Sequence, residues 1–552
     1  MIKLREVPRF QVSYAGLSFF LALYYALVVN IPVYKELTNI LDGMEAFKIG
    51  FVISVPIFLT AALTIIFNVF SWPFIGRPFF IVVLITSSMV SYAGYNYGVM
   101  FDTNMITNII QTDSSEATSY LSLRSIMWIL LMGVLPALLL AKIKLATHIS
   151  FPRVLLNKVI SMVVAAAVIL CIAALYYQDY ASLTRNNSQL KKVLIPSYYV
   201  HSTVKYLKEN YFSEPIPYQQ IALDAKQSPK ALAAAEEKPT LMVLVIGETA
   251  RSQNFELNGY NRPTNEYTRE QDVYSFQDVR SCGTATAISL PCMFSNMGRR
   301  EYEADVAAQR DNLVDVLERA GVSVLWKEND GGDKGVSRNV PKVIIDRSRE
   351  DDMCSKKSCY DMALLEGFDK EVQGLSGNRL IALHLMGSHG PTYYRRYPVD
   401  MRKFEPDCPR ADIENCTVQE IVNTYDNTIL YSDYVIAQTI EKLKSYENQF
   451  NTMLVYVSDH GESLGENGLF LHGLPYSIAP DYQTHVPMLV WMSEGVKEFK
   501  TLNSDCMEDI SQKKGVYSHD NLFHSVLGIM DVETKAYNAD QDIFRKCRQV
   551  LF

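Results

Sequence analysis

Residues 453–462 read MLVYVSDHGE, an apolar run that stops on a carboxylate, an imidazole and a glycine. A run of this length with β-branched residues predicts a strand buried on both faces, and open α/β sheets bind ligands at the carboxyl ends of such strands. Gly461 would let the backbone turn sharply there. Asp459 beside His460 suits a zinc-class cation. A lone Asp-His pair after a strand more often lies in a solvated turn. Other motifs in the chain are therefore needed to support a metal site.

The average composition of the chain hides two different halves. The chain has 552 residues, 48% of them hydrophobic, and a net charge of −8. The acidic balance and the absence of a Lys/Arg-rich tract argue against a nucleic-acid partner.

Charged residues are missing from five stretches of the N-terminal part, each close to or above the roughly 20 residues that a spanning helix needs. These stretches are 10–34, 49–76, 78–101, 125–141 and 159–178. They predict an α-helical membrane domain of five transmembrane helices over residues 1–180. The first stretch is long and lacks a clear small-residue cleavage site, so we do not interpret it as a signal peptide.

Basic residues flank alternate ends of these stretches. They are Lys3, Arg5, Arg9, Arg77, Lys142, Lys144, Arg153 and Lys158. The positive-inside rule then places the N-terminus in the cytoplasm, and an odd number of spans places everything after residue 178 outside.

Eight of the nine cysteines follow residue 280, whereas Cys171 lies in the fifth apolar stretch. Three close pairs are visible: Cys282 with Cys292, Cys354 with Cys359, and Cys408 with Cys416. Clustered pairs indicate disulfides and an oxidising compartment, the periplasm if the source is Gram-negative. Structural zinc is the rival interpretation, but no CxxC…CxxC arrangement is present. Cys506 and Cys547 are left either to pair with each other or to stay reduced.

The loop between the third and fourth stretches carries Asn108, Thr112 and Glu116 at a spacing of four residues. These side chains would share one helix face and could bind a lipid headgroup. From the spacing alone, an ordinary solvated face is favoured.

Residues 181–239 form a bridge. Apolar and charged residues alternate over 200–212 as in an amphipathic helix, which would lie either in the membrane interface or against the soluble domain. The Ala/Lys/Glu-rich segment that ends at Lys238 predicts a flexible linker.

From residue 240 to 552, short apolar strands alternate with amphipathic helices. The predicted strands are 241–246, 322–326, 380–385, 453–457 and 488–491, and the predicted helices are 312–320, 360–373 and 418–446. This alternation predicts an α/β soluble domain with a largely parallel central sheet flanked by helices.

Two further motifs carry candidate chemistry. The first strand ends on Gly247-Glu248, which offers a second carboxylate, or a plain surface acid. The segment CGTATAISLPC, residues 282–292, would hold a hydroxyl nucleophile rigidly, and Thr286 at a helix start would lie near N–H groups that suit a phosphoryl group. In isolation, Thr286 is better interpreted as an N-cap.

Histidines complete the set. His389 and His472 follow apolar runs and could bind a phosphate or a second metal, although plain loop histidines are the alternative. His384 is flanked by apolar residues and predicted to be a core residue, and His485 to be structural or near the site. Lys334 lies in a Gly-rich loop that could approach a phosphate.

Each of these motifs alone is better explained by a structural role, but their joint occurrence favours a catalytic metal site. Zinc lowers the pKa of a bound hydroxyl, so a clamped threonine could attack a phosphodiester and form a covalent phosphothreonine.

The chain strongly resembles the bacterial phosphoethanolamine transferases that modify lipid A, the family that includes mobile colistin-resistance enzymes. The resemblance covers nearly the whole chain, including a soluble domain similar to alkaline phosphatases and sulfatases. Its most specific motifs are GETAR at 247–251, CGTAT at 282–286 with PC at 291–292, GSHGPTY at 387–393, and SDHGE at 458–462.

The resemblance implies roles for single residues. Thr286 would be the nucleophile and, with Glu248, Asp459 and His460, a zinc ligand. Further substrate-binding roles fall on His389 and His472 (substrate or a second zinc), Lys334 and Thr284 (phosphate), and Asn108, Thr112 and Glu116 (lipid donor). Some relatives carry an extra cysteine pair around Lys334, where this chain has Asp333 and Ser337.

The implied activity is transfer of phosphoethanolamine from phosphatidylethanolamine to lipid A by an inner-membrane enzyme with Zn2+, one ion at rest and a second as an option during turnover. We expect the enzyme to be a monomer. The added ethanolamine would offset surface charge and give resistance to polymyxin. Two alternatives stay open: another headgroup or acceptor, such as phosphoglycerol or a core sugar, and a non-catalytic membrane-anchored sensor.

Overall fold

The computed structural model describes residues 11–42, 47–112, 117–118, 120–146, 150–187, 189–214 and 216–548. The chain divides into two compact units. The first comprises residues 1–103 and 122–205, and the second comprises residues 104–121 and 206–552. The domain boundaries expected at residues 180 and 239 stay predictions.

The first unit is helical, and helices lie within each of the five predicted apolar stretches. Among the residues that the structure describes, four helices are long and apolar enough to cross a membrane: α3 (Ile49–Phe70), α4 (Gly76–Tyr97), Leu123–Lys142 (α7, η2 and α8) and the first part of α9 (Phe151–Asn186). Leu170 and Leu175 of α9 expose 69% and 70% of their surface, as side chains that face lipid would.

The remaining stretch is a bent pair, Tyr14–Val29 (α1 and η1) followed by α2 (Ile31–Asp42), with an angle of 50°. Pro32 follows the bend as the second residue of α2, and its missing N–H cannot continue the helical hydrogen bonds across the break. The side chain of Asn30 fills the break, because it donates to Tyr25 O at 3.0 Å and Ile195 O at 2.7 Å. Counted as one span, this pair completes the five that the sequence predicts.

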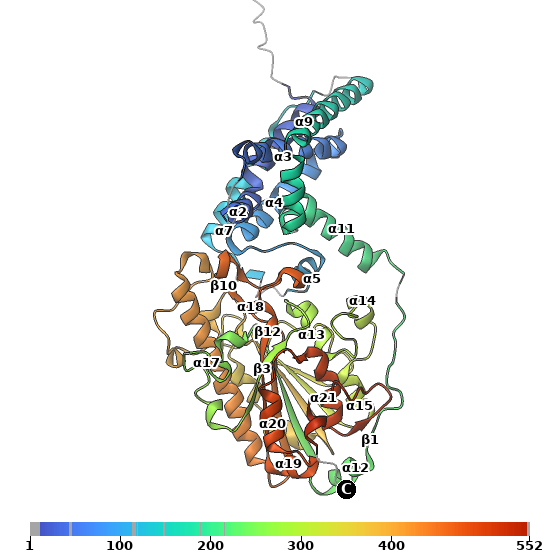
Figure 1. Ribbon diagram of the computed structural model, residues 1–552, viewed down its shortest axis with the longest axis vertical. Coiled ribbons are helices and arrows are strands. Elements are labelled where there is room, and N and C mark those ends of the chain that lie inside the picture. The colour runs from blue at the N-terminus through green and yellow to red at the C-terminus, as the bar shows by residue number, and fades with distance from the viewer. Residues whose placement is uncertain are drawn as a thin grey trace, which may run out of the picture. The chain divides into compact units, whose positions relative to one another are not determined.

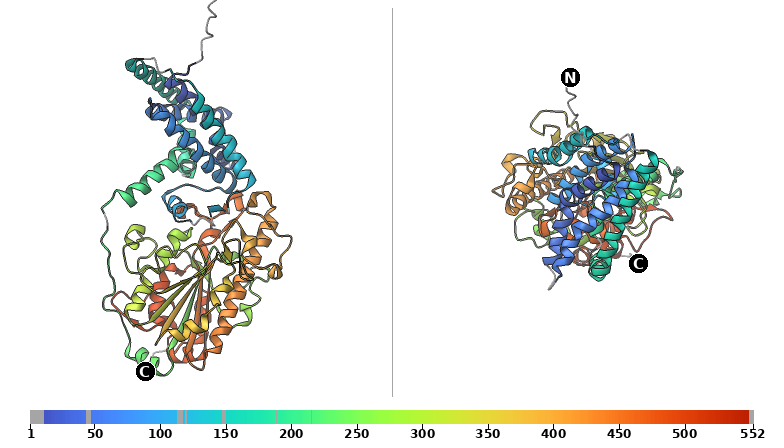
Figure 2. Two further views of the ribbon diagram at one scale, coloured as in Figure 1. Left: turned by 180° about the vertical axis from the view of Figure 1, so that it is seen from behind. Right: turned by 90° about the horizontal axis from the view of Figure 1, so that it is seen from above.

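The second unit is built on an eight-stranded sheet in the order β13-β3-β12-β9-β2-β8-β4-β5 (Figures 1 and 2). The strands are β2 (Thr240–Gly247), β3 (Tyr274–Arg280), β4 (Ser323–Glu328), β5 (Lys342–Ile344), β8 (Arg379–His384), β9 (Asn451–Ser458), β12 (His485–Met492) and β13 (Tyr517–Ser518). All neighbours pair in parallel except β12, which is antiparallel to both β3 and β9. The predicted largely parallel sheet is therefore confirmed, with one reversed strand inside it.

Helices cover both faces of this sheet (Figure 1). On one face, Leu244 of β2 shares a buried apolar cluster with Leu290 of α13 (Thr286–Phe294), Leu317 of α15 (Leu313–Arg319) and Val526 of α21 (Leu522–Ile529). On the other face lies α17 (Val418–Ser445), which begins at a capping box. The central strands β2 and β9 are buried along their whole length, so their carboxyl ends are held rigidly.

Two local predictions are wrong. The helix expected over 360–373 is a short 3-10 turn, η6 (Asp361–Leu365), and a separate helix, α16 (Phe368–Gly374), because Gly367 takes a left-handed φ of 73° between them. The segment expected to be a flexible linker contains α12 (Pro229–Glu237), which starts where Ser228 accepts a hydrogen bond from Ala231 N.

Four disulfides lie in the second unit. The three predicted pairs form, and Cys506 also pairs with Cys547. This fourth bond ties α20 (Ser504–Ser511) to η13 (Ile543–Cys547), while Cys171 is free.

Candidate active site

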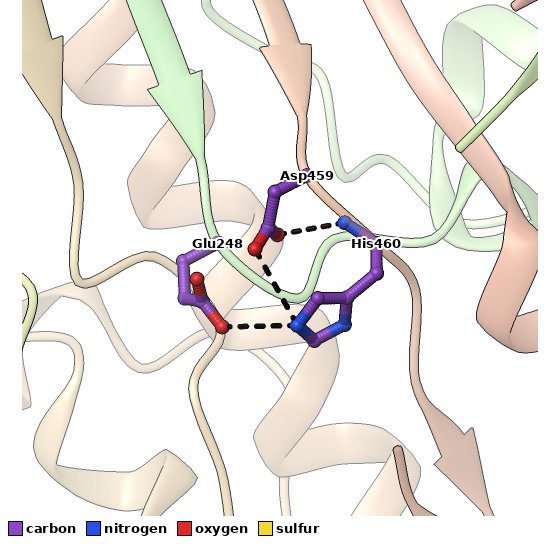
Figure 3. A group of neighbouring side chains, drawn as sticks. All are labelled: Glu248, Asp459 and His460. Carbon is purple, nitrogen blue, oxygen red and sulfur yellow. Dashed lines mark hydrogen bonds and ion pairs between the residues drawn. The ribbon is translucent and has the colours of Figure 1, made fainter. Parts of the chain in front are cut away.

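Two neighbouring strand ends bring together the predicted metal ligands. In the parallel pair β2–β9, Gly247 lies opposite Ser458, so Glu248 and Asp459 follow at adjacent positions. His460 Nε2 lies 3.4 Å from Glu248 Oε1 and 3.4 Å from Asp459 Oδ2 (Figure 3). All three residues are fully buried. The sequence thus placed these groups correctly at one edge of the sheet.

This cluster fits a metal ion. Asp459 Oδ2 is buried and has no hydrogen-bond partner. The Nδ1–H of His460 donates to Gly461 O at 2.9 Å, so Nε2 is the ring nitrogen that faces the two carboxylates and could bind a metal ion. Two carboxylates and one imidazole, each with a ligand atom within 4.8 Å of the others, are a donor set that holds zinc-class cations.

The electrostatics of the cluster also favour a cation. Burial raises the pKa of Asp459 to about 8, and the Glu248 carboxylate adds to this rise. Burial lowers the pKa of His460, but Asp459 and Glu248 outweigh it and raise the pKa to about 10. The cluster therefore retains protons that a cation would displace on binding.

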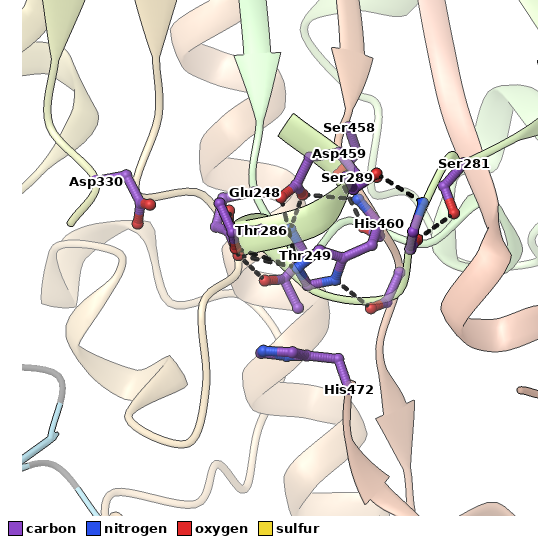
Figure 4. Close-up of polar contacts among 12 residues, drawn as sticks. Glu248, Thr249, Ser281, Thr286, Ser289, Asp330, Ser458, Asp459, His460 and His472 are labelled. Carbon is purple, nitrogen blue, oxygen red and sulfur yellow. Dashed lines mark hydrogen bonds and ion pairs between the residues drawn. The ribbon is translucent and has the colours of Figure 1, made fainter. Parts of the chain in front are cut away.

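Thr286 lies directly against this cluster (Figure 4). Its hydroxyl donates to Glu248 Oε1 and Oε2 at 3.1 Å and lies 3.3 Å from His460 Nε2. Thr286 is the first residue of α13, and the N-cap position belongs to Ala285, whose side chain cannot cap. The interpretation of Thr286 as an N-cap is therefore wrong, and N–H groups at this helix end remain for an anion.

The disulfide loop is fixed at several points. Besides the Cys282–Cys292 bond, Ser289 accepts from Gly283 N at 3.1 Å and donates to Asp459 O at 2.5 Å. These bonds link the Cys282–Cys292 loop to the end of β9 and so fix the position of Thr286 relative to Asp459 and His460.

His389 and His472 lie beside the cluster. The ring centroid of His472 is 4.4 Å from that of His460 and 5.8 Å from that of His389. Both histidines are buried, with 4% and 6% exposure. Figure 4 shows His472 below His460 and Thr286, so the imidazoles line one side of the site.

Thr284 and Lys334 occupy different surroundings. The Thr284 hydroxyl donates to Leu474 O at 2.6 Å, which ties the Cys282–Cys292 loop to the segment that carries His472. Lys334 Nζ is exposed and lies 3.5 Å from Gln111 O. The Lys334 loop has no disulfide; Asp333 instead accepts hydrogen bonds from Ser337 and Gly335 N and pairs with Lys342 at 2.9 Å.

The predicted lipid-binding stripe lies partly on α5 (Thr103–Gln111). Asn108 is on this helix, and Thr112 directly follows it and donates to Asn108 O at 2.7 Å. From residue 104 onward this segment belongs to the second unit, where the Met105 side chain lies against Gly473. Glu116 lies outside the described residues.

Several residues that support the site were not predicted. Thr249 adopts a left-handed φ of 61°, and its hydroxyl donates to Glu248 Oε1 at 2.6 Å. His519 accepts from Cys282 N at 3.0 Å, and its Nε2 donates to Ser458 O at 2.9 Å. A histidine in a polar stretch far from the motifs gives no local signal of this role.

His384 and His485 have structural surroundings. His384 is fully buried against Trp326, as predicted for a core residue. His485 Nε2 donates to Gln277 O at 3.0 Å in the β3–β12 pair.

Comparison with known proteins agrees with this geometry. Residues 240–532 match the sulfatase family, and residues 59–211 match the family "Phosphoethanolamine transferase EptA/EptB". EptA of Escherichia coli K12 is 39% identical over 529 residues, 96% of each chain. Mcr-1 of E. coli, a phosphatidylethanolamine transferase, is 35% identical over 92% of this chain and 95% of its own length.

A solved structure matches the whole molecule. The integral membrane phosphoethanolamine transferase EptA of Neisseria meningitidis is 36% identical, covers 98% of this chain and all of its own, and superposes with a TM-score of 0.93. The chain therefore belongs to the family of phosphoethanolamine transferases that includes EptA and Mcr-1.

Proposed function

We propose that this enzyme transfers phosphoethanolamine from phosphatidylethanolamine to lipid A through a covalent intermediate on Thr286. The observation that carries the proposal is the Thr286 hydroxyl at the start of α13, 3.1 Å from Glu248 and 3.3 Å from His460. A hydroxyl so clamped between a helix N-terminus and a metal-binding cluster is suited to attack phosphorus.

The reaction has two displacements. In the first, Thr286 Oγ1 forms a bond to the phosphorus of phosphatidylethanolamine, the bond from phosphorus to the diacylglycerol oxygen breaks, and that oxygen gains a proton. In the second, a phosphate or hydroxyl oxygen of lipid A attacks the phosphothreonine, and the threonine hydroxyl is restored. The Thr286 proton points to the Glu248 carboxylate, which accepts its hydrogen bond.

Zinc is the metal that we assign to Glu248, Asp459, His460 and Thr286. Bound there, it would supply a lowered pKa for the Thr286 hydroxyl and charge to offset the phosphoryl oxygens. We assign His389 and His472 to the phosphoryl group, since their rings line the same side of the site. Lys334, Thr284, Asn108, Thr112 and Glu116 are assigned to donor binding.

We also propose an inner-membrane location with a cytoplasmic N-terminus and a periplasmic catalytic unit. Two observations support it: the basic flanks of the spans, and four disulfides, all in the second unit. Added ethanolamine on lipid A would offset surface charge and lower polymyxin binding.

Mass spectrometry of lipid A tests the proposal. Cells that express the full-length chain should gain phosphoethanolamine on lipid A, and cells that express Thr286→Ala should not. Unmodified lipid A with phosphoethanolamine on a core sugar, or with phosphoglycerol on any acceptor, would contradict the assignment of acceptor or donor.

A further inference from the structure

We propose that Asp330 and His384, together with Glu248, bind a second divalent cation on the far side of Glu248 from the Thr286 site. This pair of ligands differs from His389 and His472. The binding claim rests on the geometry of three strand ends and does not require the transfer reaction.

The strand order brings these three residues together. β4, β8 and β2 are parallel neighbours, with Glu328 opposite His384 and His384 opposite Ile246. Asp330 follows β4 and Glu248 follows β2, so both flank His384, the last residue of β8. One ligand atom of each lies within 4.8 Å of the other two, and the exposures of Glu248, Asp330 and His384 are 0%, 5% and 0%.

His384 presents an unused ligand atom to this space. Its Nδ1 lies 2.8 Å from Glu328 Oε2, so Nδ1 carries the proton and donates. Glu328 is itself held by Trp326 Nε1 at 3.0 Å. Nε2 is buried and has no hydrogen-bond partner. A carboxylate that orients the far nitrogen of an imidazole is the arrangement found behind metal-bound histidines.

The spacing suits a shared cation better than a hydrogen bond. His384 Nε2 lies 3.9 Å from Asp330 Oδ2, beyond hydrogen-bond distance. If Nε2 were protonated, a buried carboxylate would be expected to close to about 2.8 Å. Two ligands that each lie about 2.1 Å from one cation are instead separated by about 3–4 Å.

The donor set selects the class of ion. One imidazole and two carboxylates suit zinc or manganese, whereas magnesium and calcium prefer oxygen alone. Glu248 would bridge the two ions, because Asp330 and His460 lie on opposite sides of it (Figure 4). A bridging carboxylate would fix Glu248 and place a second positive charge near the incoming phosphoryl group.

Metal analysis of the full-length protein in detergent tests the proposal. Wild type, Asp330→Asn and His384→Gln are loaded with Zn2+, passed through a desalting column and analysed for zinc, with Asp333→Asn as the matched control in the same loop. We expect each of the two ligand variants to lose one equivalent of zinc relative to both wild type and the control. Equal zinc content in all four proteins would overturn the proposal.

A spectroscopic measurement keeps the test decisive if a variant folds poorly. Wild type loaded with Mn2+ should give the electron paramagnetic resonance spectrum of a carboxylate-bridged pair, and Asp330→Asn the spectrum of an isolated ion. A spectrum of isolated ions in wild type would overturn the bridged site. So would loss of the pair signal in a His389→Ala/His472→Ala protein while Asp330→Asn keeps it. Because Thr286 need not react in either experiment, failure here leaves the transfer proposal untouched.

Discussion

The two sides of the candidate site to which we assign metal binding and lipid binding are built differently. Glu248, Asp459 and His460 follow two central buried strands and are fully buried themselves. Lys334 is half-buried on a loop, and Asn108 lies on a helix far away in sequence. In our proposal the sheet therefore fixes the groups that do the chemistry, whereas donor binding is assigned to a loop and a helix outside the sheet. Substitutions on the metal-binding side should therefore change the transfer rate or the zinc affinity, whereas substitutions on the lipid-binding side should change the KM for the donor.

The largest effect is expected on the rigid side. Thr286→Ala should lower the transfer rate by at least about 10³-fold, because it removes the hydroxyl that lies 3.1 Å from Glu248 and 3.3 Å from His460. The rate of headgroup transfer from a fluorescent phosphatidylethanolamine measures this. Thr439→Val is the control, since that buried hydroxyl bonds only within α17. Near-normal transfer by Thr286→Ala would contradict the assignment of Thr286 as the nucleophile.

The second-largest effect is expected in the pH dependence of the free energy of unfolding. Burial lowers the pKa of His519 to about 4 from an ordinary value near 6.5. The unfolded chain therefore binds a proton between these pH values while the folded one does not. This contribution is present above pH 6.5 and is lost as pH falls toward 4, by up to about 3 kcal/mol.

Chemical denaturation of the full-length protein at several pH values measures this loss. His519→Gln should flatten that part of the profile, and His201→Gln, on the exposed part of α11 (Ser197–Tyr211), should not. The same slope in wild type and His519→Gln would contradict the role given to His519.

A smaller effect is expected from a residue that positions a ligand. Thr249→Val removes the hydroxyl that donates to Glu248 Oε1 at 2.6 Å and should weaken zinc binding by about 10–100-fold. Competition with a chelating dye measures the affinity, and Thr249→Ser should recover most of it. If valine binds zinc as tightly as threonine, Glu248 does not depend on this contact.

The smallest effect is expected on the lipid-binding side. Lys334→Ala should raise the KM for phosphatidylethanolamine by about 10-fold and leave the zinc content unchanged, because Lys334 is not itself a proposed metal ligand. Lys356→Ala, on another exposed turn, is the control. A loss of kcat with an unchanged KM would instead place Lys334 in the chemical step.

The sequence predicted the site residues that directly follow buried strands. It did not predict the residues whose partners lie far away in the sequence. The apolar runs before Glu248 and Asp459 predicted a shared edge because parallel strands end together. The role of His519 could not be predicted, since its partners Cys282 and Ser458 are brought to it only by the fold. The helix expected over 360–373 does not form as one element, because Gly367 adopts a left-handed φ that separates η6 from α16. Likewise, Asp330 and His384 carry no motif and meet only through the strand order.

One measurement tests the central claim most directly. The full-length protein is incubated with phosphatidylethanolamine and Zn2+ without an acceptor, digested and analysed by peptide mass spectrometry. We predict a phosphoethanolamine adduct on Thr286 in wild type and none in Thr286→Ala. An adduct on another residue, or intact donor beside a zinc-loaded, unmodified enzyme, would contradict the covalent mechanism.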